Sequence, residues 1–122
     1  QYGLQDQVLV GSFYTSVLEY FRDTCPEVPT SLGQSEVIIM VAMSALGLGH
    51  LYSPAGSSVQ LPLTYFGIKI LTPAILAAAH QMNLRVDIWT VNDTTIMRDL
   101  IDMGVDGVIT DRPDLLRQLV PL

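Results

Sequence analysis

Short apolar runs alternate with longer segments of mixed polarity along this chain, and the alternation predicts strands followed by helices. The short runs are rich in β-branched residues, which is typical of strands in a sheet that is covered by other elements. We expect strands at 8–13, at about 28–31, at 85–91 and at 105–110, with a further short one at 59–62. These strands are expected to be apolar on both faces.

The intervening segments have amphipathic spacing and residues that favour helix ends. Thr72 and Pro73 form a strong helix start, as N-cap and first helical residue. Asn92 and Asp93 are expected to cap the following helix, with lining of the active site as the alternative, and Gly104 to end that helix in the left-handed conformation. Asp111 is expected to cap the last helix, with orientation of its neighbours as the alternative. Thr15 or Ser16 is expected to cap a first helix that runs to about Arg22 or Thr24. The other expected helices run from Ser35 to the Gly47/Gly49 pair, from Pro73 to about Asn83, from Thr94 to Met103, and from Asp111 and Pro113 onward.

The order strand–helix–strand–helix predicts the α/β class, with a parallel sheet covered by helices. This pattern fits either an open sheet or a TIM (β/α)8 barrel. A complete barrel needs about 250 residues, so residues 1–122 are expected to form half of one, roughly strands 5–8. Gly3 is interpreted as the stop of a helix that would precede it, and Gly107 as a site of close packing between strands.

The composition narrows the function classes. Hydrophobic residues make up 49% and charged residues 15%, with a net charge of -6. This excludes a disordered tail, and the scattered basic residues argue against nucleic-acid binding. The apolar run at 37–49 is shorter than the ~20 residues of a spanning helix, so the chain is expected not to be transmembrane.

Isolated reactive residues offer little chemistry. The single Cys25 excludes an intramolecular disulfide framework and is compatible with a reducing compartment, which slightly favours a cytoplasmic location. His80 and His50 are interpreted as structural, because neither has a carboxylate at helical spacing. The acidic residues that we interpret as solvated faces, and not as a metal site, are Asp99, Asp102, Asp106 and Asp114.

Two strand-end motifs identify a family. Residues 86–92 read Val-Asp-Ile-Trp-Thr-Val-Asn, and residues 104–113 read Gly-Val-Asp-Gly-Val-Ile-Thr-Asp-Arg-Pro. With Thr72-Pro73, Ala78-Ala79-His80 and Val10-Gly11-Ser12-Phe13, they resemble the C-terminal half of a glycerophosphodiester phosphodiesterase. The resemblance implies a (β/α)8 barrel that hydrolyses glycerophosphodiesters to glycerol phosphate and an alcohol with a divalent metal, Mg²⁺ or Ca²⁺.

The catalytic motifs of that family are absent from this sequence. They are a His-Arg-Gly, a Glu-x-Asp, a His-Asp and a Glu-x-Lys, whereas here His50 precedes Leu51, His80 precedes Gln81, and no Glu follows Glu36. The resemblance therefore implies no catalytic residue and no metal ligand in this chain. An intact parent would supply them from an N-terminal half, and the chain alone is expected to be inactive.

Substrate-facing residues can still be named. Trp89 follows a strand at the end where barrel active sites lie, so we expect it to form a wall against the substrate, with filling of the barrel core as the alternative. Ser12 and Phe13 follow another strand and are expected to line the same site. Ser12 has no base near it in the sequence, so it is not expected to be a nucleophile.

Two other functions remain open. One is a non-enzymatic binding or interaction module that kept the scaffold without the catalytic half. The other is a different barrel phosphodiesterase, such as a sphingomyelinase D or a phosphatidylinositol-specific phospholipase. An opened barrel exposes two strand edges and an apolar interior, so we expect a homo-oligomer or pairing with the missing N-terminal half.

Overall fold

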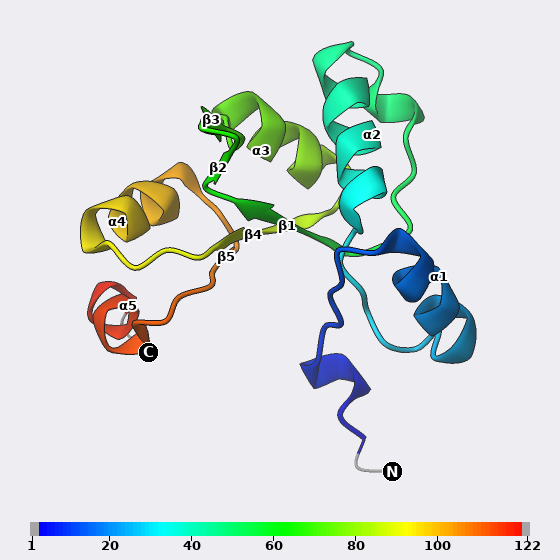
Figure 1. Ribbon diagram of the computed structural model, residues 1–122, viewed down its shortest axis with the longest axis horizontal. Coiled ribbons are helices and arrows are strands. Elements are labelled where there is room, and N and C mark those ends of the chain that lie inside the picture. The colour runs from blue at the N-terminus through cyan, green and yellow to red at the C-terminus, as the bar shows by residue number, and fades with distance from the viewer. Residues whose placement is uncertain (1–2, 121–122) are drawn as a thin grey trace.

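A three-stranded parallel sheet forms the centre of the computed structural model, which describes residues 3–120. Its strands are β1 (Ser58–Pro62), β4 (Arg85–Trp89) and β5 (Gly107–Val108), in the order β1-β4-β5. Both pairings are parallel, as the alternation of strands and helices predicts. Figure 1 shows the helices arranged around this sheet.

Two isolated parallel bridges extend the sheet toward the N-terminus. Val10 pairs with Thr30, and Ser31 pairs with Ser58. Five segments therefore follow one another in chain order, each beside the next. The segment at 59–62, expected only as a further short strand, is the β1 strand in the middle of this series. The expected strands at 8–13 and 28–31 are reduced to bridges, and the one at 105–110 to two residues.

The helices agree with the sequence pattern to within a few residues. Thr72 caps α3 by accepting a hydrogen bond from the Ile75 amide, and Pro73 is its first residue. Gly104 ends α4 with a φ of 94°. The helices are α1 (Thr15–Thr24), α2 (Gln34–Ala45), α3 (Pro73–Gln81), α4 (Thr94–Met103) and α5 (Pro113–Leu119), with 3-10 turns η1 (Gln5–Gln7) and η2 (Gly49–Leu51).

The expectation that the strands are apolar on both faces is wrong. Alternate residues of β1 and β4 enter the core beneath the helices, where Val59, Leu61, Val86 and Ile88 are almost fully buried. The residues between them, Ser58, Gln60, Arg85 and Asp87, are polar and lie on the opposite face. The interior of the opened sheet is therefore largely polar, because period-two alternation puts the two residue classes on separate faces.

A short β-hairpin between β1 and α3 was not expected from the sequence. Its strands are β2 (Thr64–Tyr65) and β3 (Ile68–Lys69), which pair in antiparallel register. Phe66 and Gly67 form the turn with φ values of 49° and 76°. Two β-forming pairs around a turn that contains glycine are the signal that could have identified this hairpin.

The helices of the described chain are short. The longest, α2, has 12 residues. Among residues 3–120, none of the helices has the length and apolar character needed to cross a bilayer.

Candidate functional site

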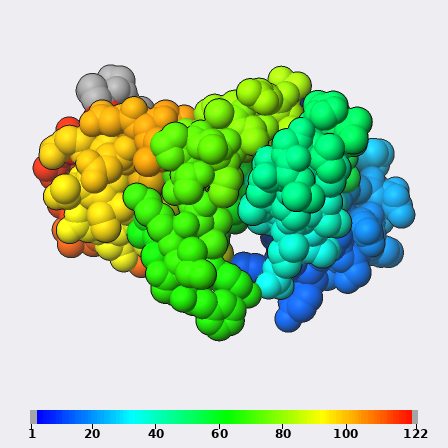
Figure 2. All heavy atoms as spheres, turned by 90° about the horizontal axis from the view of Figure 1, so that it is seen from above, coloured from blue at the N-terminus to red at the C-terminus, as the bar shows by residue number. Residues whose placement is uncertain are grey.

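A hollow of ≈ 900 Å³ opens where the parallel segments end. Figure 2 looks onto it, between the green segment that contains the hairpin and the cyan α2 helix. Each segment of the sheet contributes its carboxyl end to the wall of the hollow. These contributions are Phe13, Leu32, Pro62, Trp89 and Ile109.

The structure brings the three residues singled out as substrate-facing into this one hollow. Trp89 ends β4, while Ser12 and Phe13 follow the segment that pairs through Val10. The rings of Phe13 and Trp89 meet edge to face, with centroids 5.5 Å apart and an interplanar angle of 76°. Phe13 is 64% exposed and Trp89 is half-buried, and both rings lie in the wall of the hollow.

Ser12 has a local structural role as well. Its Oγ accepts a hydrogen bond from the Tyr14 amide over 3.1 Å, which shapes the turn into α1. Tyr14 itself occupies the N-cap position of α1 and has no side-chain capping bond, so the expectation that α1 is capped by Thr15 or Ser16 is wrong. Thr15 instead shares a hydrogen bond of 2.6 Å with Ser35 at the start of α2.

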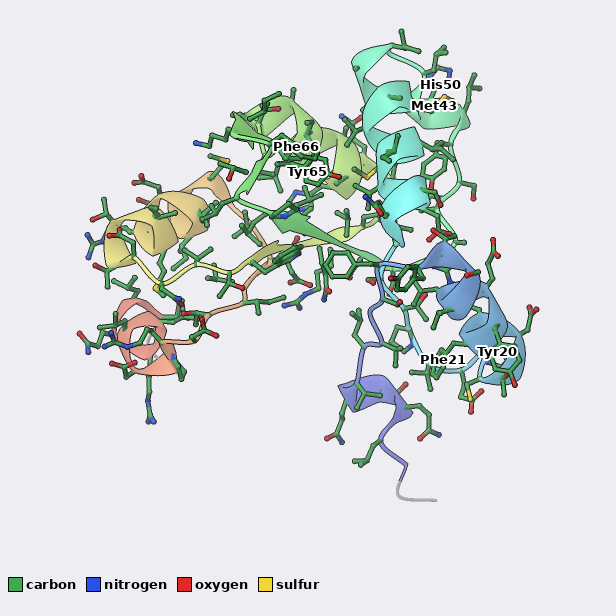
Figure 3. All side chains as sticks on the ribbon, in the orientation of Figure 1. Tyr20, Phe21, Met43, His50, Tyr65 and Phe66 are labelled. Atoms are coloured by element: carbon green, nitrogen blue, oxygen red, sulfur yellow. The ribbon has the colours of Figure 1, made fainter. Side chains whose placement is uncertain are left out.

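The α2 helix and the β2–β3 hairpin form the two side walls of the hollow. Val37, Ile38 and Val41 line it from α2. Tyr65 lines it from the hairpin, and its hydroxyl accepts a hydrogen bond of 3.4 Å from Gln34 Nε2. Figure 3 shows Tyr65 and Phe66 beside the hairpin on the side toward α2. This side wall was not expected, because the hairpin was not predicted; the glycine-containing turn at Phe66 and Gly67 is the signal that could have identified it.

The hollow carries no ionised side chain. Its polar lining residues are Ser12, Ser31, Gln34, Gln60, Thr64, Tyr65 and Thr90. Within residues 3–120, no group of three or more His, Cys, Asp or Glu residues could hold a metal ion. The residues that this chain brings to the hollow therefore do not fit a divalent cation, which needs converging oxygen ligands.

An ion pair joins α1 to the first turn of α2, the helix that forms one side wall of the hollow. Arg22 donates to both carboxylate oxygens of Glu36, over 2.8 and 3.1 Å, and also to Thr30 Oγ1 and the Ser31 carbonyl. Glu36 also accepts a hydrogen bond from the Gly33 amide. Burial alone would raise the pKa of Glu36, but the hydrogen bonds from Arg22 and Gly33 outweigh it and lower the pKa.

His80, in the last turn of α3, and Asp106, directly before β5, form a second polar cluster outside the hollow. His80 Nε2 lies 2.8 Å from Asp106 Oδ2, which also accepts a hydrogen bond from the Val86 amide. Burial would raise the pKa of Asp106, but these bonds and Arg85 lower it. The structural interpretation of His80 agrees with this pairing. Asp106 is exposed, as expected, and it also links α3 to β4 through these two bonds.

Gly107 leaves room for the Arg85–Asp87 ion pair. Arg85 Nε donates to Asp87 Oδ1 over 2.9 Å, and a Cβ on Gly107 would overlap that Asp87 oxygen. The expected close packing at Gly107 is therefore present. His50 lies in η2 beyond α2, away from the hollow (Figure 3).

Of the two residues expected to cap α4, only Asp93 does so. Asp93 accepts from the Thr95 and Ile96 amides. Asn92 does not cap; its side chain accepts from Thr110 Oγ1 and the Asp111 amide and donates to Asp111 Oδ2. The expectation that Asp111 caps α5 is also wrong, because Arg112 is the N-cap residue and Asp111 is engaged by Asn92.

Parallel strands in chain order, with helices on one face and a hollow at the carboxyl ends, define the class of β/α-barrel proteins. Within that class the chain belongs to the Glycerophosphoryl diester phosphodiesterase family, which it matches over residues 1–115. The family resemblance carried by the strand-end motifs is therefore confirmed.

Individual relatives agree with this family. The chain is 45% identical to the "Probable glycerophosphodiester phosphodiesterase 2" of Mycobacterium tuberculosis over 62 aligned residues. The aligned stretch is 51% of this chain and 24% of that protein. A solved structure from Silicibacter pomeroyi DSS-3 superposes with a TM-score of 0.72 at 23% identity, covering 95% of the chain and 38% of the other. A glycerophosphodiester phosphodiesterase from Agrobacterium tumefaciens str. C58 gives a TM-score of 0.64 at 19% identity, over 96% and 46%. The chain spans less than half the length of each.

Proposed function

We propose that this chain forms the substrate-facing part of a glycerophosphodiester phosphodiesterase, an enzyme that releases glycerol phosphate and an alcohol. The observation that carries the proposal is the convergence of Ser12, Phe13 and Trp89 on one hollow at the strand ends. These residues come from segments far apart in the sequence, and barrel enzymes bind substrate at this end of their strands. Family membership supports the same chemistry.

The number of parallel segments in this chain is five, whereas a half barrel would have four. We propose that they are five consecutive β/α units of an eight-unit barrel, one more than the four units of the half-barrel expectation. The in-order pairing of Val10, Thr30, Ser31 and Ser58 with the β1-β4-β5 sheet supports this count. The remaining units would come from polypeptide outside these residues.

The residues of the hollow can bind and orient a substrate but supply no chemistry of their own. The Phe13–Trp89 wall offers an apolar surface to the carbon skeleton, and Ser12 and Gln60 offer hydrogen bonds to oxygen atoms. A general acid, a general base and metal ligands would come from the remaining barrel units, because the hollow has no ionised group. The chain alone is therefore proposed to bind without turnover.

Release of glycerol phosphate from glycerophosphocholine, with added Mg²⁺ or Ca²⁺, tests this function. The 122-residue chain is expected to show no turnover, and the protein isolated from its native source to show turnover. In that native protein, Trp89→Ala is expected to raise KM about tenfold, which corresponds to ~1.4 kcal/mol of lost binding. Phe21→Ala is the control, because Phe21 lies on α1 outside the hollow. Hydrolysis by the 122-residue chain would contradict the proposal that the catalytic groups come from the remaining barrel units.

A binding or interaction module remains the second candidate. It is favoured by the absence of ionised groups among the lining residues of the hollow. The intact mass of the native protein separates the two candidates. A mass near 13.4 kDa would favour the binding module, and a mass about twice as large, as a full barrel requires, would favour the enzyme.

A further inference from the structure

Trp89 lies where the regular pairing of β4 with its neighbour β5 is interrupted. The Ile109 amide donates to the Ile88 carbonyl over 2.8 Å, and the Ile109 carbonyl accepts from the Val91 amide over 3.0 Å. In a regular parallel ladder the two bonds of one residue reach partners two positions apart, whereas Ile88 and Val91 are three apart. Trp89 and Thr90 both lie between these bonds, so β4 ends in a bulge with one extra residue.

The bulge turns two neighbouring side chains toward the same hollow. Consecutive side chains of a regular strand point to opposite faces, whereas Trp89 and Thr90 both line the hollow. Bulges next to functional sites re-aim side chains in this way. The orientation of the Trp89 ring, which meets the Phe13 ring with centroids 5.5 Å apart, therefore depends on what holds the bulge.

The side chain of Asn92 holds the far end of the bulge. Its Oδ1 accepts hydrogen bonds from Thr110 Oγ1 over 3.0 Å and from the Asp111 amide over 2.9 Å, and its Nδ2 donates to Asp111 Oδ2 over 3.0 Å. These three bonds form the Asn92 clamp. The bond from the Asp111 amide takes the place of the next ladder bond after those of Ile109, so the clamp extends the β4–β5 pairing beyond the bulge.

The Asn92 clamp joins the two strand-end motifs that identify the family. Asn92 is the last residue of the motif at 86–92, and Thr110 and Asp111 belong to the motif at 104–113. On the β1 side, the bulge is held by a backbone bond of 3.2 Å from the Leu63 amide to the Trp89 carbonyl. Asn92 does not line the hollow, so it can affect a bound substrate only through the residues that it holds.

We propose that Asn92 is a positioning residue for substrate binding: the Asn92 clamp fixes the bulge, and the bulge fixes the Trp89 ring in the wall of the hollow. This inference rests on the proposed function and adds to it a residue that touches no substrate. A wall that is already fixed before binding loses less conformational entropy when the ligand arrives. Loss of the clamp is therefore expected to weaken binding although every substrate-facing side chain is still present.

Fluorescence of Trp89, the single tryptophan of the chain, tests the positioning role without any turnover. In the 122-residue chain, Asn92→Ala is expected to raise the acrylamide quenching constant of Trp89 about twofold, because a loosened bulge opens the ring to solvent. Asp93→Ala is the matched control, since it removes the cap of α4 and leaves the Asn92 clamp intact. Unchanged quenching in Asn92→Ala, or equal increases in both variants, would overturn the inference.

An exchange of the two side chains separates the clamp from a general loss of stability. Asn92→Asp alone places two carboxylates across the 3.0 Å that the Nδ2 bond now spans, and it is expected to raise the quenching constant as Asn92→Ala does. Combining it with Asp111→Asn restores one donor and one acceptor in exchanged positions, and is expected to return the constant to the wild-type value. A double variant no better than Asn92→Asp would overturn the inference. This pair also decides the matter if Asn92→Ala lowers the helical circular dichroism.

Steady-state kinetics of the native protein test the link from Asn92 to the substrate. Asn92→Ala is expected to raise KM for glycerophosphocholine about fivefold with little change in kcat, because binding is weakened and the reacting groups are untouched. In a Trp89→Ala background the same change is expected to raise KM no further, since Asn92 acts through Trp89. An equal increase in both backgrounds, or a loss confined to kcat, would overturn the inference.

Failure of this inference and failure of the proposed function give different results. Hydrolysis of glycerophosphocholine by the native protein, with a KM that Asn92→Ala leaves unchanged, would overturn the inference alone. Increased quenching of Trp89 in Asn92→Ala, with no hydrolysis of any glycerophosphodiester by the native protein, would overturn the proposed function and support the positioning of the Trp89 ring by the Asn92 clamp.

Discussion

Arg22 and Glu36 show how one residue pair can position a site that neither of them lines. Their side chains are 17% and 13% exposed, and the contact joins α1 to α2 while Arg22 also binds the segment at 30–31. The first turn of α2 is thereby held against the sheet, so the residues of α2 that line the hollow, Val37, Ile38 and Val41, are held as well.

Glu36→Gln is expected to lower the free energy of unfolding by about 2 kcal/mol, because it leaves the mostly buried Arg22 guanidinium without its charged partner. Urea unfolding followed by circular dichroism measures the change. Glu27→Gln, at an exposed position in the loop after α1, is the control and is expected to have little effect. Equal losses from the two variants would contradict the assigned role of the pair.

The pH dependence follows from the same pair. Because the pKa of folded Glu36 is lower than in an unfolded chain, the pair stabilises the fold above the ordinary carboxyl range of ~4. That stabilisation is lost as the pH falls through the folded pKa. The difference in free energy of unfolding between wild type and Glu36→Gln should therefore shrink as the pH falls. A difference that grew in acid would contradict a lowered pKa of Glu36 in the folded protein.

Residue-level prediction succeeded where a single local rule decides the outcome. Thr72, Asp93 and Gly104 occupy helix ends as their side-chain chemistry requires. The capping role expected of Asn92 was wrong, and the partners of the exposed Asp106 were not predicted, because both residues bind groups from other β/α units. Which polar side chain meets which is a property of the assembled sheet, and spacing along one element does not reveal it.

At the scale of elements, the local sequence predicted the cap of α4 but not the β2–β3 hairpin. Asp93 satisfies two amides at the start of α4, as an aspartate at that position predicts. The β2–β3 hairpin is also a local element, but its strands are only two residues long and are exposed, so they show no buried face. A segment this short gives too little periodicity for the pattern to be seen.

Asp93→Ala is expected to lower the free energy of unfolding by about 1 kcal/mol, because two helix amides lose their acceptor. Thermal unfolding compared with Asp99→Ala checks this, since Asp99 lies in the exposed middle of α4 where alanine favours the helix. A loss from Asp99→Ala as large as that from Asp93→Ala would contradict capping as the cause.

At the scale of the whole molecule, the sheet has two free edges within residues 3–120. One is the segment around Val8 to Val10, whose outer side has no strand partner, and the other is β5. Unpaired edges favour association with another chain. The alternation of strands and helices predicted the parallel order of the sheet, but not which segments would pair long enough to count as strands.

Sedimentation of the chain over a range of concentrations is expected to show species heavier than 13.4 kDa, because the free edges can pair. Val8→Lys should reduce this association, since lysine on an edge opposes strand pairing. Val17→Lys, at an exposed position on α1, serves as the control. A constant monomeric mass at every concentration would contradict edge-mediated association.

The in-order pairing of the five segments also bears on how the chain reaches this structure. Every parallel contact between neighbouring segments closes a loop that contains a single helix of the sheet's cover, α1, α2, α3 or α4. The entropy lost in closing each loop is therefore similar and modest, and no pairing has to wait for distant parts of the chain to meet. Folding can start at any neighbouring pair of segments and spread outward in both directions, one unit at a time, as in a repeat protein.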